Sequence, residues 1–546
     1  MKITLTAIRN FMNAAAEPPE IWSLKRVRNV LKGYKILKSS DDKRLVNRIV
    51  EQITESELTA NRGVFSNIFF PFNTAINDRS YSQYLLINLI GTRLHASILC
   101  YLSGKSLVKA PLPKSWIDVL NKNKIGVSNQ SSAILFFLFT LKRFFYGIVV
   151  YFQFLFKNFR NLLFGNEQPI VESTYFSGLI KDCLPPENGS FSYNIIEWYL
   201  SWDGRDQSVK RICHDVKKGE YNYRDHVIES ADPFPLINGY VNFIKYVAWG
   251  FISIVIAFLN LLIGKYRYAI MLSEIHKAKM VLLANKNVLG KEYFFNNLNI
   301  AYRPLWTYAA EQKGAKIIYY NWAASFSDFL SPDGYKTTDL GEKLMSYPNI
   351  LQWSPQYSSY LQSIYQTEWT NLEIVPPIYF SDSGNVPPKS EKPTIVVFDV
   401  TPQRRYFHDI LVPFVEYRTF ENGKKFLEDI YEIAMAEGYD IVWKAKRSFT
   451  SHHSKAYIKF YQKFADMPGI IIADPSTSAF RLVQNADIIV SMPFTSTSLI
   501  GNAYSVPSVY YDPFFIISKQ DRGANGLPLL SGKDELRQWI KSLKHK

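Results

Sequence analysis

The sequence predicts an α/β protein whose C-terminal part folds around a doubly wound parallel sheet. From about residue 394 to residue 543, short apolar, β-branched runs alternate with segments of helical periodicity. Strands that alternate with helices at this spacing are typical of βαβ units and a parallel sheet. The chain has 546 residues, too many for one hydrophobic core, so we expect two or three domains.

The elements follow from apolar runs and from the residues that end them. Gly314 and Gly438, for example, each follow a helical segment, where glycine is the usual stop signal. A segment rich in proline and serine, 377–392, predicts a linker before the second domain. In the first part we expect strands at 85–89, 280–284 and 316–320 and helices at 93–102 and 302–313. After the linker we expect strands at 394–399, 440–443, 470–473, 488–490 and 508–511 and helices at 420–437, 454–465, 476–485, 498–504 and 533–543.

The composition favours an anionic partner. Lys and Arg number 63 against 48 Asp and Glu, a formal charge of +15, which suits a nucleic acid, an anionic membrane or a phosphorylated substrate. The chain lacks RNA-binding aromatic motifs, so we expect no nucleic-acid partner. The three cysteines are scattered without a CxxC pair, which argues against a disulfide framework or a zinc site and fits a reducing compartment. The N-terminus has no clear apolar signal core, and we expect it to be unprocessed.

Two segments are unusually apolar, 134–156 and 246–264. The second carries no charge and has Lys245 and Lys265 at its ends; about 20 residues suffice to cross a bilayer. One reading is a pair of buried core helices. We favour membrane association, because Lys142 and Arg143 inside the first segment suit an interfacial helix better than a straight span. A basic stretch at 25–44 is either a solvated helical face or a further attraction to anionic lipid.

Polar residues gather at one edge of the second predicted sheet. The carboxyl ends of its strands share this edge, where ligands bind in such folds. Hydroxyls and helix N–H groups there suit phosphate oxygens, and cations would neutralise phosphate charge. Each cluster alone also fits a helix cap or a solvated turn. Because the clusters share one edge, we favour a ligand-binding site. The edge carries Asp399, Thr401, Arg404, Lys444, Lys446, Arg447, Thr495, Ser496, Thr497, Ser498 and Asp512.

The segment ADIIVSMPFTSTSLIGNAYSVPSVYYDP, residues 486–513, resembles the bacterial polysaccharide-biosynthesis proteins known by their Pro-Phe-Thr-Ser motif. More distantly it resembles the last domain of GT-B glycosyltransferases that use CMP-activated sugars, such as sialyltransferases and capsule Kdo transferases. In that family a Ser/Thr pair at a helix start holds the nucleotide phosphate, a role that would fall on Ser496 and Thr497. The relatives' Lys-x-His-Pro loop corresponds to Lys444 onwards, where Lys446 stands in place of the histidine.

The resemblance implies an architecture of two Rossmann-like domains that face each other across a cleft. The acceptor would bind to the first domain, at 81–385, which carries the apolar insertions, and the nucleotide-sugar donor to the second, at 390–546. A basic, mainly helical segment, 1–80, would precede them. The implied function is a glycosyltransferase of capsule or lipopolysaccharide assembly, peripheral or monotopic at the cytoplasmic face of the bacterial inner membrane. Its partners would be the nucleotide-sugar, a glycan or glycolipid acceptor and the membrane surface.

Glycosyl transfer needs a stabilised leaving phosphate and an acceptor hydroxyl that is activated or positioned. We expect the cations and the hydroxyl loop to stabilise the phosphate without a metal or a separate cofactor. Asp328 is the first candidate for the general base and Asp399 the second. Arg303, before Pro304, is a candidate ligand of a substrate phosphate or sugar carboxylate.

Two other classes of function stay open. A non-catalytic membrane scaffold would bind a nucleotide or glycan intermediate without turnover. A phosphotransferase or epimerase on the same fold is the other alternative. Such enzymes are expected to show a Walker-type GxxxxGK[ST] or a GxGxxG loop, and the sequence contains neither.

Overall fold

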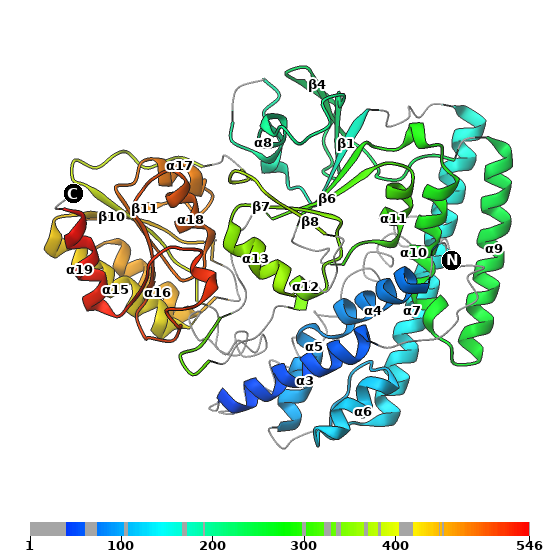
Figure 1. Ribbon diagram of the computed structural model, residues 1–546, viewed down its shortest axis with the longest axis horizontal. Helices are drawn as coiled ribbons and strands as arrows, with labels where there is room; N and C mark the ends of the chain where they lie inside the picture. Colours follow the sequence, from blue (N-terminus) through cyan, green and yellow to red (C-terminus); the bar gives the residue numbers. More distant parts are fainter. Residues whose placement is uncertain are drawn as a thin grey trace.

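The structure is a computed structural model with two α/β sheets and a helical layer (Figure 1). The second sheet lies on the left of Figure 1, the first sheet in the centre, and the long helices at the right edge. The structure describes residues 40–59, 72, 74–102, 107–165, 172–188, 192–237, 239–296, 302–321, 329–334, 340–364, 370–379, 384–402, 419–446, 448–449 and 453–544.

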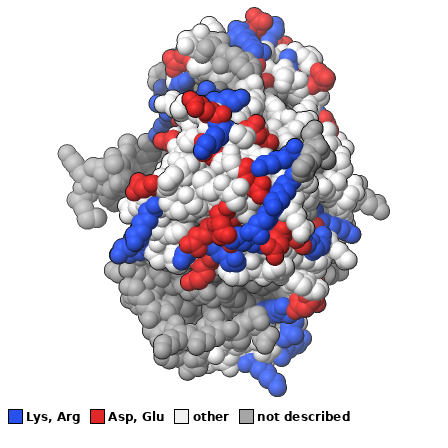
Figure 2. All heavy atoms as spheres, turned by 90° about the vertical axis from the view of Figure 1, so that its left-hand side faces the viewer, with Lys and Arg blue, Asp and Glu red and all other residues white. Residues whose placement is uncertain are grey.

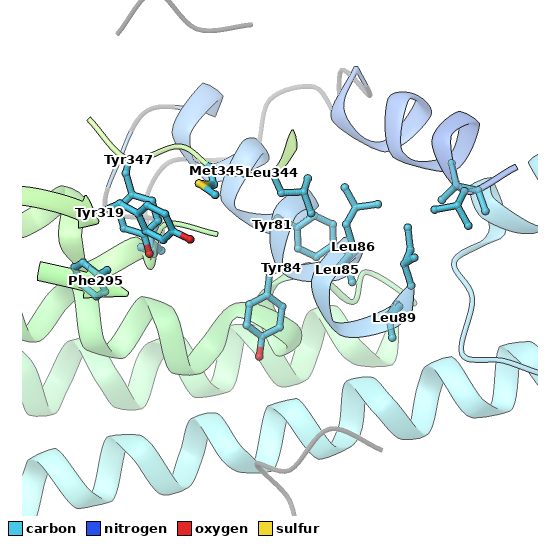
Figure 3. Close-up of a cluster of buried hydrophobic side chains, with 14 of the residues drawn as sticks. Tyr81, Tyr84, Leu85, Leu86, Leu89, Phe295, Tyr319, Leu344, Met345 and Tyr347 are labelled. Atoms are coloured by element: carbon cyan, nitrogen blue, oxygen red, sulfur yellow. The ribbon is translucent and has the colours of Figure 1, made fainter. Parts of the chain in front are cut away.

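The N-terminal helices pack against the first sheet. They are α3 (Ser40–Leu58), α4 (Thr74–Leu89), α5 (Gly91–Leu102) and α6 (Lys114–Lys122). Figure 3 shows Tyr81, Tyr84 and Leu85 of α4 beside Leu344, in the buried cluster that reaches the sheet at Tyr319.

The strand predicted at 85–89 was wrong, because these residues form the last turns of α4. Leu85, Leu86 and Leu89 are all buried. A short apolar run of this kind does not by itself distinguish a strand from a buried helix. The helix predicted at 93–102 is confirmed as α5.

Three helices form a layer at the right edge of Figure 1: α7 (Asn129–Phe164), α9 (Tyr240–Leu262) and α10 (Arg267–Leu283). Within the described residues, α7 and α9 are long and apolar enough to cross a membrane, by length and composition only. The strand predicted at 280–284 was also wrong, because it is mainly the C-terminal end of α10. Most of α10 is buried, so its apolar run has no visible helical period.

The first sheet has the order β3-β4-β2-β1-β5-β6-β7-β8, and all its strand pairs are parallel except β3–β4. Its strands are β1 (Ser173–Ser177), β2 (Arg211–His214), β3 (Tyr221–Tyr223), β4 (His226–Ser230), β5 (Glu292–Asn296), β6 (Lys316–Tyr320), β7 (Asn349–Gln352) and β8 (Asn371–Ile374). The associated helices are η1 (Lys181–Cys183), α8 (Ile195–Ser201), η2 (Lys286–Val288), α11 (Leu305–Gln312), α12 (Leu340–Lys343) and α13 (Pro355–Ile364).

The second sheet is parallel throughout, with the order β11-β10-β9-β12-β13-β14. Its strands are β9 (Thr394–Phe398), β10 (Asp440–Lys444), β11 (Ile470–Ala473), β12 (Ile488–Ser491), β13 (Ser508–Asp512) and β14 (Leu529–Ser531). Its helices are α15 (Phe420–Glu437), α16 (Lys455–Ala465), α17 (Ala479–Gln484), α18 (Ser496–Ala503), η3 (Arg522–Ala524) and α19 (Lys533–Leu543). The predicted elements of this half are confirmed apart from small shifts at their ends, and β14 was not predicted.

Both faces of the second sheet are covered. On one face Trp443 and Val397 pack with α15 and α16, and on the other Phe398 and Ile489 pack with α17 and α18. Helices on both faces of a parallel sheet define a doubly wound domain. The expected α/β fold with two doubly wound sheets is therefore confirmed.

Figure 2 shows the face at the left of Figure 1, where basic and acidic side chains are interspersed. In the second domain, Lys544 pairs with Glu437 at 2.9 Å and Lys392 with Asp440 at 3.8 Å. The positive charge surplus of the chain is therefore not gathered into a single patch on this face.

The carboxyl edges of the two sheets meet. The Leu330 carbonyl, after β6, accepts a hydrogen bond from the Ser518 N–H, after β13, at 2.8 Å. Trp353, after β7, lies 6.2 Å from Phe480 of α17 between ring centroids. The loops that follow strands in both domains are therefore in contact.

Candidate functional site

The order of the strands in the second sheet indicates where a ligand is expected to bind. Chain order reverses between β9 and β12, which lie side by side at the centre of the sheet. In open parallel sheets, ligands bind outside the carboxyl ends of the strands at such a switch point. The loop after β12 contains the Pro-Phe-Thr-Ser motif, so the sequence motif lies at the expected ligand position.

Strand register places three residues level with one another at this edge. Phe398 at the end of β9 pairs with Lys444 of β10 on one side and with Ser491 of β12 on the other. Residues that pair across parallel strands point to the same face. Two strand spacings of about 4.8 Å put the backbones of Lys444 and Ser491 about 10 Å apart, a span suited to a ligand that contacts both strands.

Phe494, the second residue of the motif, fixes the shape of the loop. Its φ is +61°, in the left-handed region that non-glycine residues seldom adopt. Its ring is buried between the domains, 5.2 Å from Phe329 and 5.7 Å from Tyr510. A side chain at Gly523 would come within 2.7 Å of the same ring. The aromatic residue of the motif is therefore an anchor at the domain boundary.

The hydroxyls of the motif have unequal roles. Thr495 donates to the Met492 carbonyl at 3.0 Å, and Thr497 lies 2.8 Å from the Ser491 hydroxyl. Ser498 is buried and donates to the Val509 carbonyl at 3.1 Å. Among the residues that the structure describes, the Ser496 hydroxyl makes no hydrogen bond, and it is the group left for a ligand.

The first turn of α18 offers backbone donors as well. The helix begins at Ser496, and Thr495 at its N-cap makes no side-chain capping bond. The first N–H groups of a helix have no partner inside the helix, and the helix dipole favours an anion there. Ser496 thus adds its hydroxyl to a helix end that already suits a phosphate.

Lys444 is the second charged feature of the edge. Its side chain is 8% exposed, and in the described part of the chain it forms no ion pair or hydrogen bond. Burial lowers its pKa, while Asp399 and Asp474 act in the opposite direction. A buried cation without a direct partner is costly unless a ligand pairs with it. Lys446 lies further out and is exposed, and Arg447 lies outside the described residues.

Asp399 is turned toward α16. It is 2% exposed and accepts a hydrogen bond from the hydroxyl of Tyr457. Burial raises the pKa of Asp399 to about 6, against the effects of Tyr457, Lys444 and the backbone of Lys446. A carboxyl group that titrates near neutrality is typical of functional sites as well as of buried networks. The candidate base Asp328 lies outside the described residues.

Thr401 and Asp512 differ in whether their side-chain oxygen atoms are already bonded within the protein. The Thr401 hydroxyl is buried and has no hydrogen-bond partner among the residues that the structure describes. Asp512 accepts backbone hydrogen bonds from Phe514 at 3.1 Å, Ile516 at 2.6 Å and Ile517 at 2.9 Å. Its carboxylate therefore holds the turn after β13. Arg404 lies outside the described residues.

Arg303 lies in the first domain with local partners. It donates to the Thr307 hydroxyl at 3.0 Å, pairs with Glu311, and lies 3.7 Å from the centroid of the Tyr308 ring. These contacts tie Arg303 to α11. Within the described part of the chain, these partners all lie in the first domain, away from the edge around Lys444.

Sequence reasoning did not single out Ser491 or the switch point of the first sheet. At the latter, between β1 and β5, Asp215 accepts from the Gly178 N–H at 2.7 Å, and Asn296 donates to the Gly178 carbonyl at 3.0 Å. No sequence signal marked this position, because β1 and β2 were not predicted. Among the described residues, no group of three or more His, Cys, Asp or Glu side chains is placed to hold a metal ion.

Solved structures with a distant similarity include two transferases and an epimerase. The lipopolysaccharide outer core galactosyltransferase WaaB is 10% identical, with a TM-score of 0.31, and covers 68% of this chain and 89% of its own. A variant of the wall teichoic acid polymerase TagF is 11% identical, with a TM-score of 0.36, and the alignment covers 73% of this chain and 90% of that one. The UDP-GlcNAc 2-epimerase of Methanocaldococcus jannaschii is 11% identical, with a TM-score of 0.33 and coverages of 68% and 92%. Because these TM-scores are below 0.5, they do not decide the activity of this chain.

No curated protein matches the chain. A family model described as "Polysaccharide biosynthesis PFTS motif protein" matches residues 255–540, more than half of the sequence. The match includes the whole second sheet and the motif loop. It confirms the resemblance based on Pro-Phe-Thr-Ser, whereas the resemblance to CMP-sugar transferases stays a prediction. The chain belongs to the polysaccharide biosynthesis PFTS motif proteins.

Proposed function

We propose that this protein is a glycosyltransferase that moves a sugar from a nucleotide-sugar to a growing surface polysaccharide or a lipid-linked acceptor. The observation that carries the proposal is that Lys444 and the uncapped start of α18 lie at the same carboxyl edge of the second sheet, on the two sides of β9 at the switch point. A buried lysine that forms no ion pair with the described residues and a helix N-terminus without a side-chain cap are both suited to a nucleotide phosphate. Membership in a polysaccharide-biosynthesis family supports the sugar chemistry.

In the proposed mechanism, the second domain stabilises the leaving nucleotide. Lys444 neutralises charge that develops on the phosphate, while the Ser496 hydroxyl and the N–H groups of the first turn of α18 donate to its oxygens. Donors fixed before the reaction stabilise developing charge well, and removal of one typically costs about 10²–10³ in rate. The proposal requires no metal ion, because cations and helix donors supply the charge. CMP-sugars are the favoured donors, in capsule or lipopolysaccharide assembly.

Lys444→Gln tests the proposal directly. Removal of a charged hydrogen-bond partner costs about 1.5–3 kcal/mol, so we expect affinity for the preferred nucleotide to fall about 10- to 100-fold. The experiment is calorimetry with CMP, UDP and GDP and their sugars, with acceptor present. Lys463→Gln is the matched control, because this exposed lysine lies at the C-terminal end of α16, toward the opposite edge of the sheet. Failure of the wild-type protein to bind any of these ligands would refute the proposal.

The second candidate function is a scaffold that binds a nucleotide or glycan without turnover. The observation that favours it is the orientation of Asp399, which is bonded to Tyr457 of α16. This bond holds its carboxyl group away from the motif loop, and Asp328 is not described. A nucleotide-sugar that binds tightly but is neither hydrolysed nor transferred in any acceptor mixture would favour the scaffold over the enzyme.

A further inference from the structure

Helices α7 and α9 form an antiparallel pair at the surface of the first domain. Phe159 lies 6.3 Å from Phe243 between ring centroids at one end, and Phe144 lies 6.2 Å from Phe258 further along. Figure 1 shows the two helices side by side along one edge, with α10 on their inner side. Their packing is close, because a side chain at Gly250 would come within 2.2 Å of the Tyr151 ring.

The outward sides of these helices carry many exposed apolar side chains, which are together called here the α7–α9 face. Its exposed side chains include Phe145, Phe152 and Phe156 of α7 and Phe251, Phe258 and Leu262 of α9, with exposures between 44% and 67%. Soluble monomers seldom expose contiguous apolar patches beyond a few hundred Å². Six large side chains from adjacent helices exceed what isolated surface residues would explain.

The charged residues within the two helices have one sign, although Lys157 pairs with Asp232 beside α7 at 3.4 Å and Arg143 is directed inward to Asn88. Neither α7 nor α9 contains an Asp or Glu, whereas together they carry Lys142, Arg143, Lys157, Arg160 and Lys245. Arg160 and Lys245 are exposed near one end of the pair, and Lys265 is exposed just after α9 at the other. Cations at both ends of an apolar surface suit anionic headgroups around an acyl layer. A second copy of the chain would instead bring like charges together.

A cavity of about 630 Å³ adjoins the second of these ends. It is lined by Phe136 and Tyr266 together with the exposed Lys114 and Lys265. Its lining also includes Asp118, so the lysines are not its only charges. Like the face, the cavity combines apolar walls with lysines at its rim. This combination suits a single anionic lipid headgroup.

The packing behind α7 and α9 indicates whether these helices lie on a membrane or cross it. Helix α10 packs behind both helices, is largely buried, and carries Glu274 and Lys277 as an ion pair at 2.8 Å. With 36 residues, α7 is about 54 Å long, far longer than the roughly 30 Å hydrocarbon core. Insertion of α7 across a bilayer would carry α10 and the edge of the first domain into hydrocarbon, where polar groups without partners are costly.

We propose that the α7–α9 face lies in the plane of an anionic bilayer and inserts its aromatic and aliphatic side chains into a single leaflet. The two helices then act as a monotopic platform, with the first sheet and the second domain on the aqueous side. The proposal is independent of glycosyl transfer, because it depends on exposure, charge and packing alone.

Vesicle flotation of the full chain tests the surface. We expect the protein to float with phosphatidylcholine vesicles that contain 25% phosphatidylglycerol, and at least tenfold less with phosphatidylcholine alone. The triple variant Phe152→Glu/Phe251→Glu/Leu262→Glu is expected to lose flotation at least tenfold with an unchanged melting temperature, because these side chains are exposed. The matched control is Leu107→Glu/Ile180→Glu/Ile374→Glu, which changes three exposed apolar residues outside the face.

Cysteine labelling distinguishes helices that lie in one leaflet from helices that cross the bilayer. Gln130→Cys and Arg160→Cys place thiols near the two ends of α7, in a background with the native cysteines replaced. On intact vesicles, an impermeant maleimide added outside is expected to label both positions. Protection of only one position would show a span. The wild-type protein could instead fail to float and form a dimer by light scattering. If the triple variant is then a monomer, the face binds a second copy of the chain. Either outcome overturns the proposal.

Discussion

Phe494 of the motif loop stacks on Phe329 of the first domain, with ring centroids 5.2 Å apart and ring planes inclined by 19°. Phe494 is buried, and its backbone has a positive φ. Such backbone strain of about 1–3 kcal/mol persists only where the surroundings hold it in place. The stack therefore couples the shape of the motif loop to the position of the first domain.

We expect Phe494→Ala to destabilise the protein by about 3–5 kcal/mol, the usual cost of removing a buried phenylalanine ring. A double-mutant cycle with Phe329→Ala is expected to give a coupling energy of about 0.5–1.5 kcal/mol. Urea unfolding measures both quantities. Ile374→Ala, at an exposed apolar position, serves as the control and is expected to change stability little. Additive effects of the two phenylalanine variants would contradict the stacking.

Five strands of the second sheet, β9 to β13, could be predicted from the sequence because each is a short apolar run with β-branched residues that a helix and a turn residue separate from the next, whereas β14 has no such run. Ile488 to Val490 and Ile470 to Ala473 are examples. The same rule failed for Leu85 to Leu89 and for Met280 to Ala284, because a helix buried on several sides shows no period.

The candidate site was only partly predictable. The common edge followed from βαβ order, and Lys444 and Ser496 could be placed on it in this way. The sequence could not predict which hydroxyls bond within the protein and which stay available for a ligand, because this depends on tertiary contacts such as that of Ser498 with the Val509 carbonyl. The anchoring of Phe494 by the first domain is likewise a long-range contact that no local pattern indicates.

Ser496 and Ser498 are expected to respond in opposite ways to alanine. Ser496→Ala removes a hydroxyl that makes no hydrogen bond with the described residues, so nucleotide affinity should fall about 10-fold with an unchanged melting temperature. Ser498→Ala removes a buried hydrogen bond and should cost about 1 kcal/mol of stability, with affinity preserved at temperatures where the protein is folded. Calorimetry and thermal unfolding give the two readouts. Equal effects of the two variants on affinity would show that Ser496 has no special role.

Gly250→Ala is expected to disturb the contact between α9 and α7. The added methyl group would meet the Tyr151 ring at 2.2 Å, and such overpacking typically costs about 1–3 kcal/mol. Gly219→Ala is the control, because nothing lies within 4 Å of a side chain there. Thermal unfolding should show a lower midpoint only for Gly250→Ala. An unchanged midpoint would mean that the two helices are packed less closely than the structure shows.

The pH dependence of stability should report the buried carboxyl of Asp399. Its pKa is raised from 3.8 to about 6 by burial, so the folded protein holds this proton more tightly than the unfolded chain. The stability that results is fully present below about pH 4 and is lost as the pH rises through 6. A difference of about two pKa units corresponds to about 3 kcal/mol.

Asp399→Asn cannot lose a proton, so we expect the variant to gain stability relative to the wild type by about 3 kcal/mol between pH 4 and pH 7. Chemical unfolding at a series of pH values measures this difference. Asp474→Asn is the control of opposite sign, because hydrogen bonds from Ser476 lower the pKa of Asp474. A stability difference between wild type and Asp399→Asn that stays constant across this range would show that folding does not raise the pKa of Asp399, and would remove it as a candidate proton acceptor tuned toward neutrality.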